Sequence, residues 1–96
     1  MDDEILAYVA EREAILARVK EVLIDRLKVS RAPDEIDLDA PLFGTGLLLD
    51  SVDALELTVA LETEFGIRLS EEGIGPDSFR TVQSLIDLVR ANGGQP

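Results

Sequence analysis

One serine in an acidic setting is the part of this sequence best suited to chemistry. Ser51 lies between Asp50 and Asp53 at the start of the apolar-periodic stretch "LLLDSVDALEL", residues 47–57. A serine acts as a nucleophile when a neighbouring base takes its proton, and the chain has no histidine to do so. We therefore expect no catalytic residue here.

The residues around Ser51 predict that it opens a helix. Asp50 is a favoured N-cap residue, and Asp53 three positions later completes a capping box. Ser51 is then the first helical residue, and its hydroxyl is not used for capping. Unpaired N–H groups and the positive end of the helix dipole favour a phosphate at this position, although the neighbouring aspartates partly offset that preference.

The predicted helix runs from about residue 51 to residue 65, ends at Gly66 and carries two apolar stripes. The first stripe is Val52, Leu55 and Val59, and the second is Leu57, Leu61 and Phe65. One stripe must face the core. On so short a helix, we expect the other stripe to stay partly exposed between acidic residues as a docking surface. The alternative is that a tight bundle buries both stripes.

The remaining pattern predicts a small all-α protein. Apolar spacing indicates a helix over residues 3–28, a short helical turn over residues 70–74 and a last helix that begins near Thr81 and stops at Gly93. Residues 30–46 form a long loop, for which the candidate apolar anchors are Ile36, Leu38, Leu42 and Phe43. We expect one domain, residues 1–96, folded as a four-helix bundle with three main helices and one short helix. Residues 1–14 would be a helical extension and residues 92–96 a disordered tail.

Composition narrows the possible partners. The formal net charge is −11, and residues 32–67 contain nine acidic residues but no lysine or arginine. This charge disfavours nucleic acids and anionic membranes, and it favours basic protein surfaces. The absence of cysteine and histidine disfavours disulfides, thiolate metal sites and most zinc sites, so we expect no metal. The sequence has no apolar run long enough to span a membrane and no start that resembles a signal peptide, so we expect a cytoplasmic protein without membrane insertion. We also expect a monomer.

Around Ser51 the sequence resembles the acyl carrier proteins. "DSVDALELTVALETEFGIRL" is similar to their second helix, in which Asp-Ser-Leu is followed by alternating acidic and apolar residues and a Glu-Phe pair. The resemblance continues through "VKEVLIDRLKV" and "LF" upstream and through "TVQSLIDLV" downstream, over about residues 15–90. It implies a carrier, not an enzyme. In such a carrier, Ser51 would hold a 4′-phosphopantetheine arm, taken from coenzyme A, whose thiol carries acyl groups as thioesters.

The resemblance also assigns roles to other residues. The positions that match partner-docking sites of the family are Asp50, Val52, Asp53, Leu55, Glu56, Val59 and Glu62. The positions that match the core around the acyl chain are Phe43, Leu57, Leu61, Phe65 and Leu69. The implied partners are a phosphopantetheinyl transferase and loading, synthase and acyltransferase enzymes of fatty-acid, lipid or polyketide-type synthesis, with basic docking patches. Val52 replaces the family's leucine and Leu48 its glycine, which favours a specialised member.

Other functions fit the sequence less well. A peptidyl or D-alanyl carrier is the nearest alternative, but peptidyl carriers usually have a Gly-Gly pair where this chain has leucines. An acidic helical interaction module without a prosthetic group would use the same charged helix. A calcium site among Asp34, Asp37 and Asp39 does not follow the EF-hand spacing. An enzyme would have only carboxylates as bases.

Overall fold

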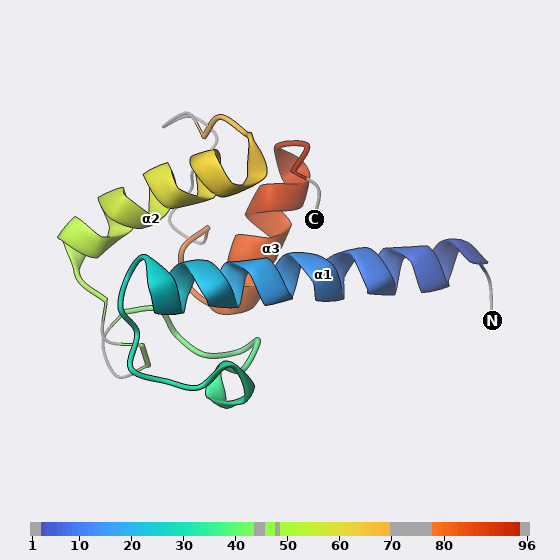
Figure 1. The fold of residues 1–96 in the computed structure, drawn as a ribbon. Coiled ribbons are helices and arrows are strands. Elements are labelled where there is room, and N and C mark those ends of the chain that lie inside the picture. The colour runs from blue at the N-terminus through green and yellow to red at the C-terminus, as the bar shows by residue number, and fades with distance from the viewer. Residues whose placement is uncertain (1–2, 44–45, 48, 70–77, 95–96) are drawn as a thin grey trace.

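The computed structural model describes residues 3–43, 46–47, 49–69 and 78–94 (Figure 1). The helices are α1 (Asp3–Asp25), α2 (Ser51–Phe65) and α3 (Val82–Ala91), with a 3₁₀ turn, η1 (Pro33–Glu35), between the first two. Across these ranges the only β-type pairings are two isolated bridges, Pro41 with Thr81 and Phe43 with Leu49. The prediction of an all-helical fold is confirmed.

The fourth helical element differs from the prediction. The expected turn over residues 70–74 lies outside the described residues. Within the described part of the chain, the additional helical element is the 3₁₀ turn η1, in the loop that was expected to be irregular. Pro33 sets the backbone for this turn, and the Glu35 carboxylate accepts a hydrogen bond from the Ala32 N–H at 2.9 Å. We had not anticipated it, because three residues are too few to show helical periodicity.

Helix α1 ends three residues earlier than predicted. Its last helical residue is Asp25, and Lys28 adopts a left-handed backbone conformation with φ of 60°. The Val29 N–H donates to the Leu23 carbonyl at 3.0 Å, which closes the helix end. A helix end with a left-handed residue usually has glycine at that position. Because this chain has a lysine there, the sequence pattern did not indicate that the helix ends here.

The core is mostly aliphatic and lies where α1 packs against both α2 and α3. Ile15, Val19 and Leu23 of α1 are fully buried in it. The loop between α1 and α2 is anchored by Ile36 and Leu42, as predicted, and Phe43 packs partly buried against the core. The prediction for Leu38 is wrong: its side chain is 41% exposed.

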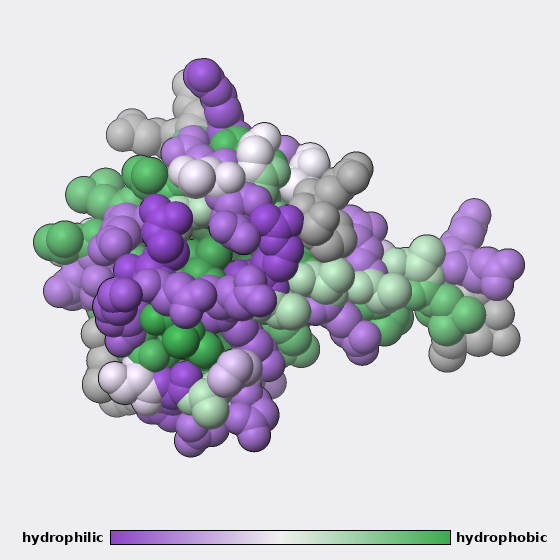
Figure 2. Space-filling view, in the orientation of Figure 1, coloured by the Kyte–Doolittle hydropathy of each residue, from purple (hydrophilic) through white to green (hydrophobic). Residues whose placement is uncertain are grey.

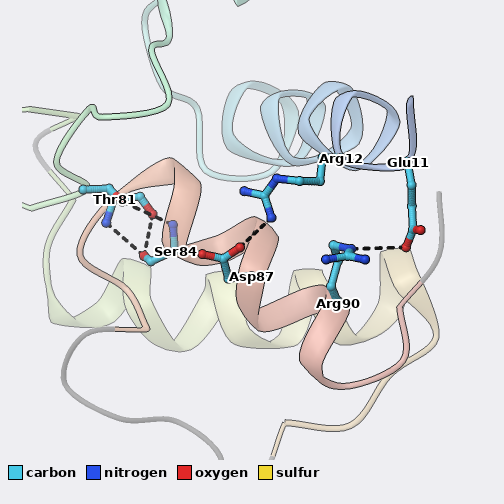
Figure 3. A network of polar contacts seen from close by, with 6 residues as sticks. All are labelled: Glu11, Arg12, Thr81, Ser84, Asp87 and Arg90. Carbon is cyan, nitrogen blue, oxygen red and sulfur yellow. Dashed lines mark hydrogen bonds and ion pairs between the residues drawn. The ribbon is translucent and has the colours of Figure 1, made fainter. Parts of the chain in front are cut away.

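The first turns of α1 project beyond the rest of the molecule (Figures 1 and 2). Ion pairs with α3 hold the base of this extension (Figure 3): Arg12 binds Asp87 at 2.6 Å, and Arg90 binds Glu11 at 3.3 Å. The hydrogen bond from Arg12 to Asp87 raises the pKa of the Arg12 guanidinium above its ordinary value. The Arg90 guanidinium also lies over the Tyr8 ring, 4.6 Å from its centroid. The extension is therefore a continuous part of α1.

The end of α3 is also well defined. Thr81 caps α3 through reciprocal hydrogen bonds with Ser84 (Figure 3), which confirms the predicted start. At the other end, the N–H groups of Gly93 and Gly94 donate to carbonyls of the last helical turn. Of the tail that was expected to be disordered, residues 95–96 lie outside the described ranges. Among the described residues, no helix is long and apolar enough to cross a membrane.

Candidate functional site

The start of α2 is built by the predicted capping box. The Asp53 N–H donates to the Asp50 carboxylate at 2.9 Å, and the Asp50 N–H donates to the Asp53 carboxylate at 3.0 Å. Asp50 has the extended backbone of an N-cap, with φ of −116° and ψ of −174°. Ser51 is consequently the first residue of α2. It is exposed, and its hydroxyl makes no hydrogen bond within the part of the chain that the structure describes.

The two apolar stripes of α2 lie in different environments. Val52, Leu55 and Val59 are 69%, 72% and 56% exposed, while Leu57 and Leu61 are fully buried and Phe65 nearly so. The alternative that the bundle buries both stripes is therefore wrong. An exposed apolar stripe of this size has no role in the core of this chain, so it is a candidate contact surface.

The acidic residues near the stripe are of two kinds. Asp50 and Glu56 are exposed. Asp53 is half-buried and held in the capping box, and half-buried Glu62 accepts a hydrogen bond from the Leu69 N–H at 3.0 Å. Of the seven residues predicted for docking, five are exposed and these two are half-buried; Asp50, although exposed, is held in the same capping box as Asp53. Asp53 and Glu62 thus help shape the surface as well as charge it.

The residues predicted to surround a hydrophobic cargo lie in one region. Leu57, Leu61 and Phe65 belong to the buried cluster, and Phe43 and Leu69 pack against it partly buried. Four of these five come from different turns of α2 and the segment after it, while Phe43 comes from the preceding loop. These five residues therefore belong to or border the core, and their role around an acyl chain stays a prediction.

Arg18 fixes the far end of α2 to α1. Its guanidinium donates to the Glu64 backbone carbonyl, binds the Glu64 carboxylate at 3.0 Å and lies over the Phe65 ring, 4.8 Å from the centroid. A cation at a helix C-terminus satisfies an unpaired carbonyl and complements the helix dipole. Arg18 therefore holds the C-terminal end of α2 against α1, away from Ser51 at the start of the helix.

The structure also brings two bases to the start of α2, which we had not predicted. A hollow of about 330 Å³ lies between the end of α1 and the start of α2, and Lys28 and Arg31 line it together with Asp53. Lys28 and Arg31 are more than twenty residues from Asp53 in the sequence, and no periodic pattern indicates that these two segments lie close together. A larger hollow of about 470 Å³ is lined by residues of α1 and by Arg31 and Pro33, away from Ser51.

The described residues include no group of three acidic, histidine or cysteine side chains placed to hold a metal ion. A calcium site at Asp34, Asp37 and Asp39 therefore gains no support. The chemistry of this surface is that of a free hydroxyl, an exposed apolar stripe and carboxylates.

Comparison with known proteins agrees with this geometry. A family model described as a phosphopantetheine attachment site matches residues 17–89. The acyl carrier protein of Petrotoga mobilis is 33% identical over 78 residues, which cover 81% of this chain and 86% of that protein. The acyl carrier protein of Thermosynechococcus vestitus is 36% identical over 75 residues, which cover 78% of this chain and 86% of that protein. The family match covers the last part of α1, all of α2 and most of α3.

Proposed function

This chain belongs to the acyl carrier protein family, and we propose that Ser51 is the residue that holds its phosphopantetheine. Attachment needs an accessible hydroxyl, and the exposed, unbonded Ser51 side chain offers one. Several other hydroxyls among the described residues are already used by the fold. Thr58 and Thr63 donate to carbonyls one turn back in α2, and Ser84 and Thr81 cap α3. Ser30 is exposed but lies outside any capped helix start.

The protein is a carrier, not an enzyme, and its cofactor is phosphopantetheine. When bound, that group supplies a thiol that holds an acyl group as a thioester. The residues of this chain position the arm. The capping box of Asp50 and Asp53 keeps Ser51 at the first helical position. The two neighbouring carboxylates are engaged in that capping box and the chain has no histidine, so a separate transferase would remove the proton of the hydroxyl. Because the chain has no cysteine, the arm would carry its only thiol.

We also propose that the exposed stripe of α2 is the surface on which the transferase and the biosynthetic enzymes dock. Leu55 and Val59 would supply the apolar contact, and Asp50 and Glu56 would steer basic patches of the partners. The exposure of Leu55 and Val59 supports this proposal, because apolar side chains on a stable bundle gain nothing for folding by facing water.

The pathway is proposed more broadly as fatty-acid, lipid or polyketide-type synthesis. The acyl chain would enter the apolar region of Phe43, Leu57, Leu61, Phe65 and Leu69. The leucine at position 48 and the valine at position 52, which differ from the usual family residues, support a carrier specialised for one pathway. We further propose that the chain works as a monomer and that a short helix over residues 70–74 completes a four-helix bundle.

Intact-mass measurement tests the attachment site. The protein is incubated with coenzyme A and a broad-specificity phosphopantetheinyl transferase, alongside Ser51→Ala and, as matched control, Ser30→Ala. We expect the mass of one phosphopantetheine to be added to the native chain and to Ser30→Ala, but not to Ser51→Ala. A mass gain that persists in Ser51→Ala would overturn the assignment. Mass spectrometry of protein from its natural host would identify the cargo and separate an acyl carrier from an aminoacyl carrier.

A further inference from the structure

The hollow between α1 and α2 has the composition of a small-molecule site. Its volume of about 330 Å³ falls within the range of roughly 300–1,000 Å³ that such sites occupy. Its apolar part consists of Leu27, Val29, Leu47 and Leu49, all of the buried cluster, and the Asp53 carboxylate lies at its α2 side. Two cations, Lys28 and Arg31, line it as well. This mixture suits a ligand with both methyl groups and hydrogen-bond acceptors.

Lys28 is not explained by the fold. Its left-handed backbone, with φ of 60°, costs stability for any residue with a Cβ atom, and glycine is the usual choice there. The side chain is exposed, and among the described residues its ammonium makes no hydrogen bond or ion pair. Within the described ranges, Arg31 makes one long hydrogen bond, to the Gly46 carbonyl at 3.3 Å, which leaves most of its donors unused by those residues. Both cations thus have donors available for a ligand.

We propose that this hollow, the α1–α2 cradle, receives the pantetheine part of the arm on Ser51, an inference that rests on the proposed function. Lys28 and Arg31 would donate hydrogen bonds to the amide carbonyls of the arm. Their positive charge would also attract its phosphodiester. The methyl groups of the arm would cover the apolar residues of the cradle.

The tether explains why this ligand is favoured over one from solution. A chain of net charge −11 repels free anions, whereas a tethered arm is present at an effective concentration that linkage sets. Leu49 and Asp53, each two residues from Ser51 along the chain, both line the cradle, so the arm can enter it close to its attachment point. The cradle leucines belong to the same buried core as Leu57 and Leu61.

The test uses a coenzyme A analogue with a nitroxide spin label on its thiol end. Native protein is loaded with it, loading is verified by intact mass, and paramagnetic broadening of backbone amides is recorded by NMR. We expect strong broadening at Val29, Leu47 and Leu49, and its loss when the label is reduced. If the mass does not change, the proposed function fails, and the cradle fails with it. If the mass increases but these amides stay sharp, the cradle alone is refuted.

Variants separate the two cations from general effects. Lys28→Asn combined with Arg31→Gln removes both charges, and asparagine tolerates the left-handed backbone. Lys20→Gln, on α1, is the control for a lost lysine. All should load completely, and we expect the broadening to fall several-fold in the double variant and to persist in the control. Equal broadening in both would show that the cations do not hold the arm and would overturn the proposal.

Discussion

Two leucines of α2, two positions apart, allow a direct test of which face of the helix serves folding. Leu57 is fully buried and Leu55 is 72% exposed. The substitution Leu→Ala changes helix propensity equally at both sites, so any difference in stability reports packing alone. We expect Leu57→Ala to lower the free energy of unfolding by about 2–5 kcal/mol, the cost of lost burial plus a cavity. For Leu55→Ala we expect a change within about 0.5 kcal/mol.

These values give large differences in a chain of this size. The free energy of unfolding of a small domain is only about 5–15 kcal/mol, so Leu57→Ala would remove a large part of it. At about 4–8 °C per kcal/mol, the melting temperature would fall by roughly 8–40 °C. Circular dichroism during heating measures this directly. Urea titration provides the check that the midpoint moves while the slope stays constant.

The same pair separates folding from function. Leu55→Ala should keep its melting temperature and slow the loading of Ser51 by the transferase several-fold, because it removes apolar contact area from the docking stripe. Similar melting temperatures for the two variants would refute the assignment of the stripes. Unchanged loading kinetics in Leu55→Ala would refute the docking role of the exposed stripe while leaving the core assignment intact.

Three further substitutions test the electrostatics and the helix ends. Glu56→Lys should slow association with the transferase, most strongly at low salt, whereas the same charge change in Glu21→Lys on α1 should have a smaller effect; equal rates for both would argue against local steering. Asp50→Ala should reduce the free energy of unfolding by about 0.5–2 kcal/mol through loss of the α2 cap, measurable by urea titration, and no change would contradict the capping role. Lys28→Gly should instead raise the melting temperature by several degrees, because glycine relieves a left-handed backbone that costs other residues about 1–2 kcal/mol. A lower melting temperature would show that the lysine side chain supports the fold.

The parts of the structure that could be predicted are those set by local chemistry. The capping box of Asp50 and Asp53, the Gly66 stop of α2 and the Thr81 cap of α3 depend on residues three or four positions apart, and all were predicted. The end of α1 was missed because Lys28 occupies a position that usually holds glycine. Leu38 was misjudged because an apolar residue in a loop carries no periodic signal for the side it faces.

The distribution of charge could be predicted only in part, because it depends on which charges the fold neutralises. The sequence indicated an acidic middle segment, but only the fold places Arg18 on Glu64, at the end of α2. Arg12 and Arg90 likewise bind acids between α1 and α3. In the described structure, these three arginines bind acids away from Ser51. Lys28 and Arg31 lie near the start of α2, but exposed Glu56 has no ion-pair partner among the described residues. Negative charge that is not neutralised by an ion pair therefore remains beside the exposed stripe of α2. A partner with a basic surface is attracted to this charge, and there it also comes within reach of the Ser51 hydroxyl.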